Sequence, residues 1–155
     1  MAKNTIDKQK EINKMVEKLS LDGKALVEKA YKTRGFIDRT YNLHDSYGSA
    51  VYYNGVLQPN SIYYLQEQAT DAKRWYGKML RGRNEIVDFF IEYKGRGKGF
   101  DLVLVAAMPY ASILEHGQGT LRRKYQVISG TMSDMRELAR KYKGSISRTS
   151  TSRVV

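Results

Sequence analysis

The chain contains two histidines, and each is adjacent to a carboxylate: His44 precedes Asp45, and His116 follows Glu115. A histidine oriented by a carboxylate is a common general base in hydrolytic enzymes. Adjacent residues of a strand point to opposite faces, so we expect neither pair to form such a dyad. Spacing marks no third catalytic group. We therefore predict a protein without catalytic residues, and a nuclease or hydrolase using His44 or His116 is the enzymatic alternative.

Cofactor and metal chemistry has little support in the composition. The absence of cysteine excludes a disulfide framework, a thiolate nucleophile and a thiolate metal site. Gly95, Gly97 and Gly99 alternate with cations, but they follow a predicted helix and precede a predicted strand. A dinucleotide-binding loop has the reverse order. We predict neither a cofactor nor a metal.

Positive charge is the main chemical property of the chain, because 27 Lys and Arg stand against 16 Asp and Glu, a formal net charge of +11 over 155 residues. The excess lies at both ends and in two short loops, whereas residues 41–80 carry equal numbers of both signs. Such a balance favours a polyanionic partner. The candidate phosphate contacts are Arg81, Arg83, Lys94, Arg96 and Lys98, with Arg122, Arg123 and Lys124 as a further group.

The apolar spacing over the first thirty residues predicts the long helix that opens the fold. Its stripe begins with Ile12, Met15, Val16 and Leu19. Gly23 interrupts the pattern, and Asp22 can cap a continuation that ends near Gly35.

A hairpin over residues 46–57 follows, where the period changes to two. Odd-numbered residues from Tyr47 to Tyr53 share one face of a predicted strand, and the even-numbered residues share the other. Asn54–Gly55 suits a two-residue turn, because both residues can take φ > 0. Val56 and Leu57 begin the return strand, which Pro59 ends.

The middle of the chain has helical spacing again. We predict a helix over residues 62–80, within an insertion at 58–84, and a second helix opened by Asn84. Residues 94–99 form a basic loop. Phe100 to Met108 is a nearly continuous apolar run, typical of a strand that is covered on both faces.

The C-terminal third adds a possible strand at Tyr125–Ile128 and a helix opened by a capping box of Thr131 and Asp134. Segregated strands and helices predict one α+β domain over residues 1–143, with an antiparallel sheet or a partly closed barrel. Residues 144–155 are expected to be a flexible tail. The N-terminus lacks the apolar stretch of a signal peptide, and no apolar run reaches the ~20 residues that span a bilayer, so we expect no membrane association.

Residues 36–48 resemble a signature of the tailed-phage head–tail joining (tail completion, neck) proteins, in which a helix leads through Asp-x-Thr-Gly-Asn-Leu-x-x-Ser into a hairpin. The matching residues are Asp38, Thr40, Asn42, Leu43 and Ser46. Tyr41 stands where the family usually has glycine. A second segment, after the buried strand, is similar to the family's Tyr-Ala-x-x-Val-Glu-x-Gly pattern in Tyr110, Ala111, Glu115 and Gly117.

This resemblance implies a structural virion protein, not an enzyme, that is assembled in the host cytoplasm. Such proteins form a ring, here of six or twelve copies, between the portal or adaptor and the tail, which extends the DNA channel and offers a docking surface. The five loop cations would then contact packaged DNA without reading its sequence, and the motif residues would serve the fold. The alternatives are a small basic nucleic-acid-binding protein and another virion component, such as a tail terminator or minor capsid protein.

Overall fold

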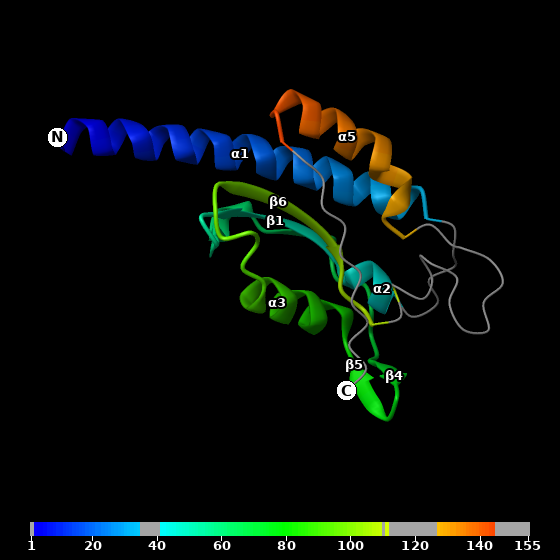
Figure 1. Ribbon diagram of the computed structural model, residues 1–155. Coiled ribbons are helices and arrows are strands. Elements are labelled where there is room, and N and C mark those ends of the chain that lie inside the picture. The colour runs from blue at the N-terminus through cyan, green and yellow to red at the C-terminus, as the bar shows by residue number, and fades with distance from the viewer. Residues whose placement is uncertain (1, 35–40, 110, 112–126, 145–155) are drawn as a thin grey trace.

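The computed structural model describes residues 2–34, 41–109, 111 and 127–144 (Figure 1). Its helices are α1 (Ala2–Lys32), α2 (Asn42–Asp45), α3 (Gly82–Glu92) and α5 (Met132–Lys141), with short 3-10 turns at Pro59–Ser61 and Ser129–Thr131. Its strands are β1 (Tyr47–Tyr53), β2 (Val56–Leu57), β3 (Tyr63–Tyr64), β4 (Lys73–Trp75), β5 (Lys78–Leu80) and β6 (Phe100–Ala106). The α+β class predicted from the sequence is confirmed.

Strand β1 is the centre of a four-stranded antiparallel sheet. Along one edge it pairs with β2 and then β3, and along the other it pairs with β6 over its whole length, from Tyr47↔Ala106 to Tyr53↔Phe100. The sheet is not closed into a barrel, so the antiparallel sheet is the one of the two predicted arrangements that is confirmed. The hairpin at 46–57 is confirmed, and both turn residues have positive φ, 50° at Asn54 and 80° at Gly55.

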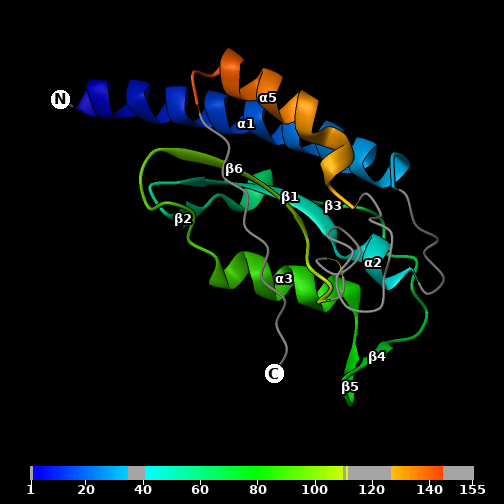
Figure 2. The same cartoon turned by 45° about the vertical axis from the view of Figure 1, so that its right-hand side comes forward.

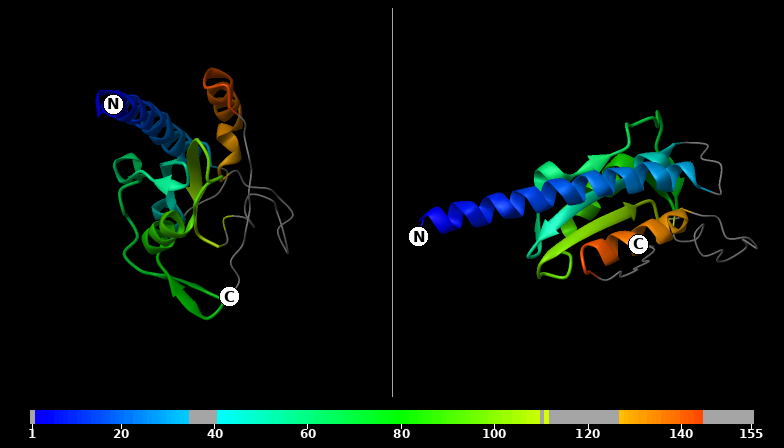
Figure 3. Two further views of the ribbon diagram at one scale, coloured as in Figure 1. Left: turned by 60° about the vertical axis from the view of Figure 1, so that its left-hand side comes forward. Right: turned by 90° about the horizontal axis from the view of Figure 1, so that it is seen from above.

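Helices cover both faces of this sheet. Helix α1 lies across one face with α5 beside it, and α3 lies against the opposite face (Figures 1 and 2). The N-terminal part of α1 extends beyond the sheet (Figure 3). Because β1 is enclosed by helices above and below and by strands on both edges, its first six residues are all buried.

The alternation along β1 divides the core in two, as the sequence predicted. Val51 packs with Val16 and Leu19 of α1, whereas Ala50 and Tyr52 pack on α3. Burial of such side chains is the main favourable term in folding, at about 25 cal/mol per Å² of apolar surface.

Helix α1 runs through Gly23 without interruption, so the predicted break there is wrong. A Cβ atom at this position would lie 2.7 Å from Ser49 Oγ and 2.9 Å from Leu102 Cδ1. The glycine therefore allows the helix to approach β1 and β6 closely, and this contact outweighs the roughly 1 kcal/mol by which glycine weakens a helix.

The predicted helix over residues 62–80 is also wrong. Tyr63 and Tyr64 pair with β1, and β4 and β5 form a separate hairpin. The helical spacing is misleading because its members have different environments: Leu65 is buried, whereas Tyr76 is 67% and Met79 61% exposed. Pairing with the sheet, which the sequence does not reveal, determines the structure here.

One predicted helix start is wrong, and one predicted helix cap is absent. Helix α3 begins at Gly82 instead of Asn84, because the Gly82 N–H is capped by a distant side chain, Asn42. Helix α5 has Thr131 at its N-cap, but the expected capping box is absent: the Thr131 hydroxyl donates to the Ile128 carbonyl instead.

Several predictions lie partly or wholly outside the described residues. The possible strand at Tyr125–Ile128 is described only at Val127 and Ile128, which form a bend. Beyond the described residues lie Asp38, Thr40, Tyr110, Glu115, His116, Gly117, Arg122, Arg123, Lys124 and the tail from 145 onward.

We predict that Gly82→Ala destabilises the protein strongly, by several kcal/mol. The added Cβ would lie 1.8 Å from the Asn42 carbonyl oxygen, a backbone atom that cannot move without displacing α2. Urea unfolding measures the effect. Gly144→Ala is the matched control, because a Cβ there meets nothing within 4 Å, and equal stability of the two variants would contradict the prediction.

Candidate functional site

The segment that resembles the phage signature leads into β1 through one tight helical turn. Tyr41 precedes it with φ 61° and ψ 9°, in the left-handed region that favours glycine. All four residues of α2, Asn42, Leu43, His44 and Asp45, are buried. A bulky residue at positive φ is rare, so the surrounding contacts must hold this turn in place.

His44 and Asp45 do form a pair, contrary to the prediction. His44 Nδ1 lies 2.8 Å from Asp45 Oδ1, and the histidine is 6% exposed and the aspartate fully buried. The prediction placed both residues on a strand, where neighbours diverge. They lie instead on a single helical turn, which brings them together.

The Asp45 carboxylate is fully engaged with the backbone. Oδ1 also accepts the Gln68 N–H at 2.9 Å, and Oδ2 accepts the Ala69 N–H at 2.8 Å. The Tyr31 and His44 rings pack in a T-shaped arrangement, with centroids 4.6 Å apart. These contacts identify Asp45 as the anchor of segment 65–70, and its carboxylate has the partners of a structural group.

Asn42 forms a second buried clamp. Its Oδ1 accepts the Gly82 N–H at 3.0 Å, and its Nδ2 donates to the Asp71 carbonyl at 2.8 Å. One side chain thus ties α2 to the start of α3 and to the base of the β4–β5 hairpin. Leu43 is buried in the core, and the Ser46 hydroxyl donates to the Leu43 carbonyl at 2.7 Å.

The five candidate DNA contacts separate into two groups. Arg81 and Arg83 lie at the start of α3, and the loop with Lys94, Arg96 and Lys98 follows its end. Eleven helical residues rise about 16 Å, and Figure 1 shows the two groups at opposite ends of the helix. The structure therefore does not bring the five together into one patch.

Three of the five cations have partners within the fold. The Arg83 guanidinium lies over the Tyr64 ring at 4.6 Å and donates to the Leu65 carbonyl. Arg96 Nε donates to Asp101 Oδ1 at 2.7 Å, which offsets its charge. Arg81 is exposed and makes one long contact, 3.3 Å, with the Thr70 carbonyl.

The basic loop at 94–99 is attached to the β1–β2 turn. Asn54 Oδ1 accepts the Gly99 N–H at 2.8 Å, and the Asn54 N–H donates to the Gly99 carbonyl at 2.9 Å. Lys94 and Lys98 are exposed on this anchored loop. They are the loop cations best placed to reach an external phosphate.

The β4–β5 hairpin is a surface feature that the sequence did not reveal. It carries exposed Arg74 and Lys78, and its turn residues Tyr76 and Gly77 both have positive φ, 46° and 76°. The signal in the sequence was weak, because Tyr-Gly lacks the turn preference of Asn-Gly and the flanking strands have three residues each.

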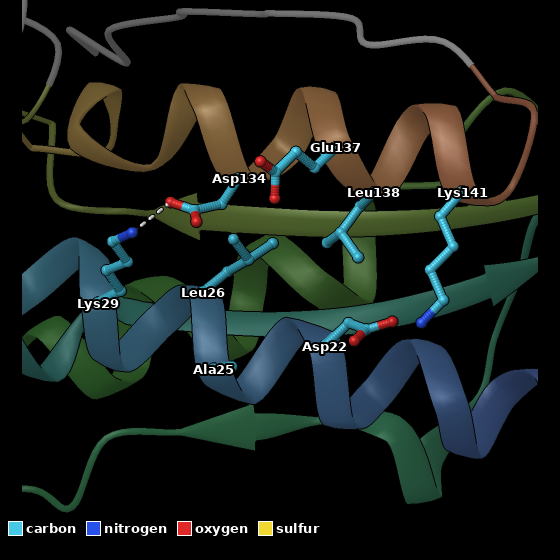
Figure 4. Close-up of a pocket in the computed structure, with 8 residues that line it drawn as sticks. All are labelled: Asp22, Ala25, Leu26, Lys29, Asp134, Glu137, Leu138 and Lys141. Carbon is cyan, nitrogen blue, oxygen red and sulfur yellow. Dashed lines mark ion pairs between the residues drawn. The ribbon is translucent and has the colours of Figure 1, made fainter.

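A shallow groove of about 260 Å³ separates α1 from α5 (Figure 4). Lys29 of α1 pairs with Asp134 of α5 at 2.8 Å, and the Tyr142 hydroxyl donates to Asp22 Oδ2 at 2.7 Å. Burial, together with the hydrogen bond and charge of Asp22, raises the pKa of Tyr142 to about 12. These contacts bind the two helices to each other.

Several tyrosine hydroxyls are hydrogen-bonded within the fold. Tyr52 donates to the Phe90 carbonyl at 2.6 Å, and Tyr47 donates to the Val127 carbonyl at 2.7 Å. Burial is the main cause that raises the pKa of Tyr52. Both side chains are fully buried and belong to the core of the fold.

Comparison with known proteins gives no match to a family model, to a curated protein or to a solved structure. Within the described part of the chain, no helix is long and apolar enough to cross a membrane. No group of three or more His, Asp or Glu residues in that part is arranged to hold a metal ion.

We predict that Tyr142→Phe flattens the alkaline loss of stability. Below about pH 10 the tyrosine is neutral in both the folded and unfolded chains. Above about pH 10 the tyrosine ionises in the unfolded chain but stays neutral in the folded chain, where its pKa is about 12. Folding stability therefore falls between about pH 10 and pH 12. Urea unfolding at pH 9 and pH 11 should show a smaller loss for the variant than for the wild type. Equal losses would contradict the assignment.

Proposed function

We propose that the chain is a structural protein of a tailed-phage virion, which forms a ring in the neck between the portal or adaptor and the tail. The ring extends the DNA channel and provides a docking surface for the next component. The observation that carries this proposal is the backbone of Tyr41, which has φ 61° at the position where the resembling family usually has glycine.

This backbone bears on Tyr41, the one mismatch in the first motif. A glycine signature at a fixed position reflects a backbone that needs positive φ, and the chain keeps that backbone with a tyrosine in place of glycine. The conformation is costly for a bulky residue, and the buried α2 that follows holds it in place. A positive φ at this position supports the resemblance where residue identity differs.

The described motif residues also have the roles that the resemblance implies. Asn42 and Ser46 make hydrogen bonds within the fold, and Leu43 and Ala111 lie in the core. The order of a long helix, this turn, a hairpin and a later strand follows the family pattern. None of these four residues needs a substrate to explain its burial.

The surface of the chain suits assembly and contact with a polyanion. Lys94 and Lys98 project from an anchored loop, and Arg81 lies exposed at the start of α3. Contact of this kind depends on phosphate charge and not on base identity. The basic nucleic-acid-binding protein remains the second candidate, favoured by the same exposed lysines.

We predict added ring density when the purified protein is mixed with its portal–adaptor complex and imaged by electron microscopy. The density should be coaxial with the channel, and the protein should be present in purified virions. A portal–adaptor complex that gains no density, together with virions that lack the protein, would overturn the proposal.

We predict that replacing Lys94 and Lys98 with Gln weakens DNA binding equally for all sequences. Each lost phosphate contact lowers the slope of log affinity against log salt by about 0.9, so the double variant should lose about two units of slope. Fluorescence anisotropy titrations with labelled DNA, at salt concentrations from about 50 mM upward, measure this slope. Arg74→Gln with Lys78→Gln is the matched control on the hairpin, and an equal or larger loss there would contradict the assignment to the loop.

A further inference from the structure

The β4–β5 hairpin projects from the body of the molecule. It leaves the fold at the start of α3 and extends away from that helix (Figures 1 and 2). Its strands pair only with each other among the described strands, in the register Arg74↔Met79 and Trp75↔Lys78. A two-stranded ribbon alone is marginally stable in water, so a surface that covers it would stabilise it.

The hairpin combines positive charge with exposed apolar side chains. Arg74 lies directly opposite Met79, which is 61% exposed, and Tyr76 at the tip is 67% exposed. Lys78 is also exposed, and residues 72–84 contain no acidic residue. The matching surface should therefore be acidic around an apolar centre.

The outward face of α3 has this complementary composition. Ile86 and Phe90 turn inward to the sheet, whereas Asp88, Ile91 and Glu92 are exposed, a spacing of three to four residues that places them on one face. Ile91 is 70% exposed, the largest value among the large apolar residues of the described chain.

We propose that the β4–β5 hairpin of one copy docks on the outward face of α3 of the next copy. Met79 and Tyr76 would cover Ile91, and Arg74 and Lys78 would lie against Asp88 and Glu92. Because the two surfaces differ, the contact is head-to-tail, the kind that generates rings. The inference rests on the proposed ring and identifies the two surfaces that close it.

A second copy fits the hairpin better than DNA does. DNA would satisfy Arg74 and Lys78 but would leave Met79 without an apolar partner. A second copy accounts for the exposed apolar residues on both elements at once. Electrostatic complementarity of this kind sets orientation and suppresses wrong pairings.

The proposed contact between copies buries little surface. Three apolar side chains cover less surface than a stable two-protein interface, which buries about 1,600 Å² in total. In a closed ring every copy makes the contact twice, once with each neighbour. Binding to the portal or adaptor raises the local concentration of the copies. Assembly should therefore be weak in solution and strong on the portal or adaptor.

Cross-linking tests the contact directly, because the native chain has no cysteine. Met79→Cys and Ile91→Cys are introduced together into the full chain at two exposed positions, and a short bismaleimide is added at high protein concentration. We expect a ladder of covalent oligomers on denaturing gels. Products limited to the dimer, or no product above either single variant, would overturn the head-to-tail arrangement.

Charge exchange provides a second test with its own control. Arg74→Glu with Lys78→Glu should weaken self-association about tenfold, because the reversed charges would repel Asp88 and Glu92 and exposed charge pairs contribute modestly. Asp88→Lys with Glu92→Lys should do the same. All four changes in one chain should restore association, measured by sedimentation, and failure to restore it would contradict the pairing. Unchanged melting temperatures would show that the variants are folded.

The two proposals fail in different ways. If the ring forms on the portal but the cysteines do not cross-link, this inference is wrong and the proposed function stands. If the cysteines give the ladder but no density appears on the portal, the contact stands and the proposed function is wrong.

Discussion

Two buried polar side chains, Asn42 and Asp45, hold together segments that are far apart in the chain. Between them they bind the backbone of Gln68, Ala69, Asp71 and Gly82. Burying an unpaired carboxylate would cost several kcal/mol, so each contact must form for the fold to be stable. The same contacts fix the start of α3 and the base of the β4–β5 hairpin. The turn that carries the phage-like motif therefore positions both surfaces of the proposed subunit contact.

The sheet gives these surfaces a rigid support. Strand β1 is covered by α1 and α3 and paired on both edges, and so it cannot shift without disrupting the core. The exposed groups, by contrast, lie on the hairpin, on the outward face of α3 and on the loop at 94–99. This division suits a subunit whose interior maintains shape while its periphery meets neighbours and DNA.

The sequence predicted correctly those elements that depend on residues close together in the chain. The apolar stripe of α1, the Asn54–Gly55 turn and the buried run of β6 each follow from periodicity or turn preference. The predictions failed where contacts with residues distant in the sequence determine the local structure. Gly23 stays helical because of Ser49 and Leu102, α3 starts early because of Asn42, and residues 62–80 form strands because β1 is available for pairing. The His44–Asp45 pair was missed because its helical turn was taken for a strand, and Arg74 and Lys78 were missed because their hairpin was taken for a helix.

The central claim is that Asp45 is a structural anchor, and hydrogen exchange of single amides tests it most directly. The amides of Gln68 and Ala69 lie outside any helix or strand, yet both donate to the Asp45 carboxylate. We expect them to exchange as slowly as the amides of the β1–β6 ladder, which open only with the whole fold. Exchange as fast as in an exposed loop would show that the carboxylate does not hold this segment, and would contradict the account.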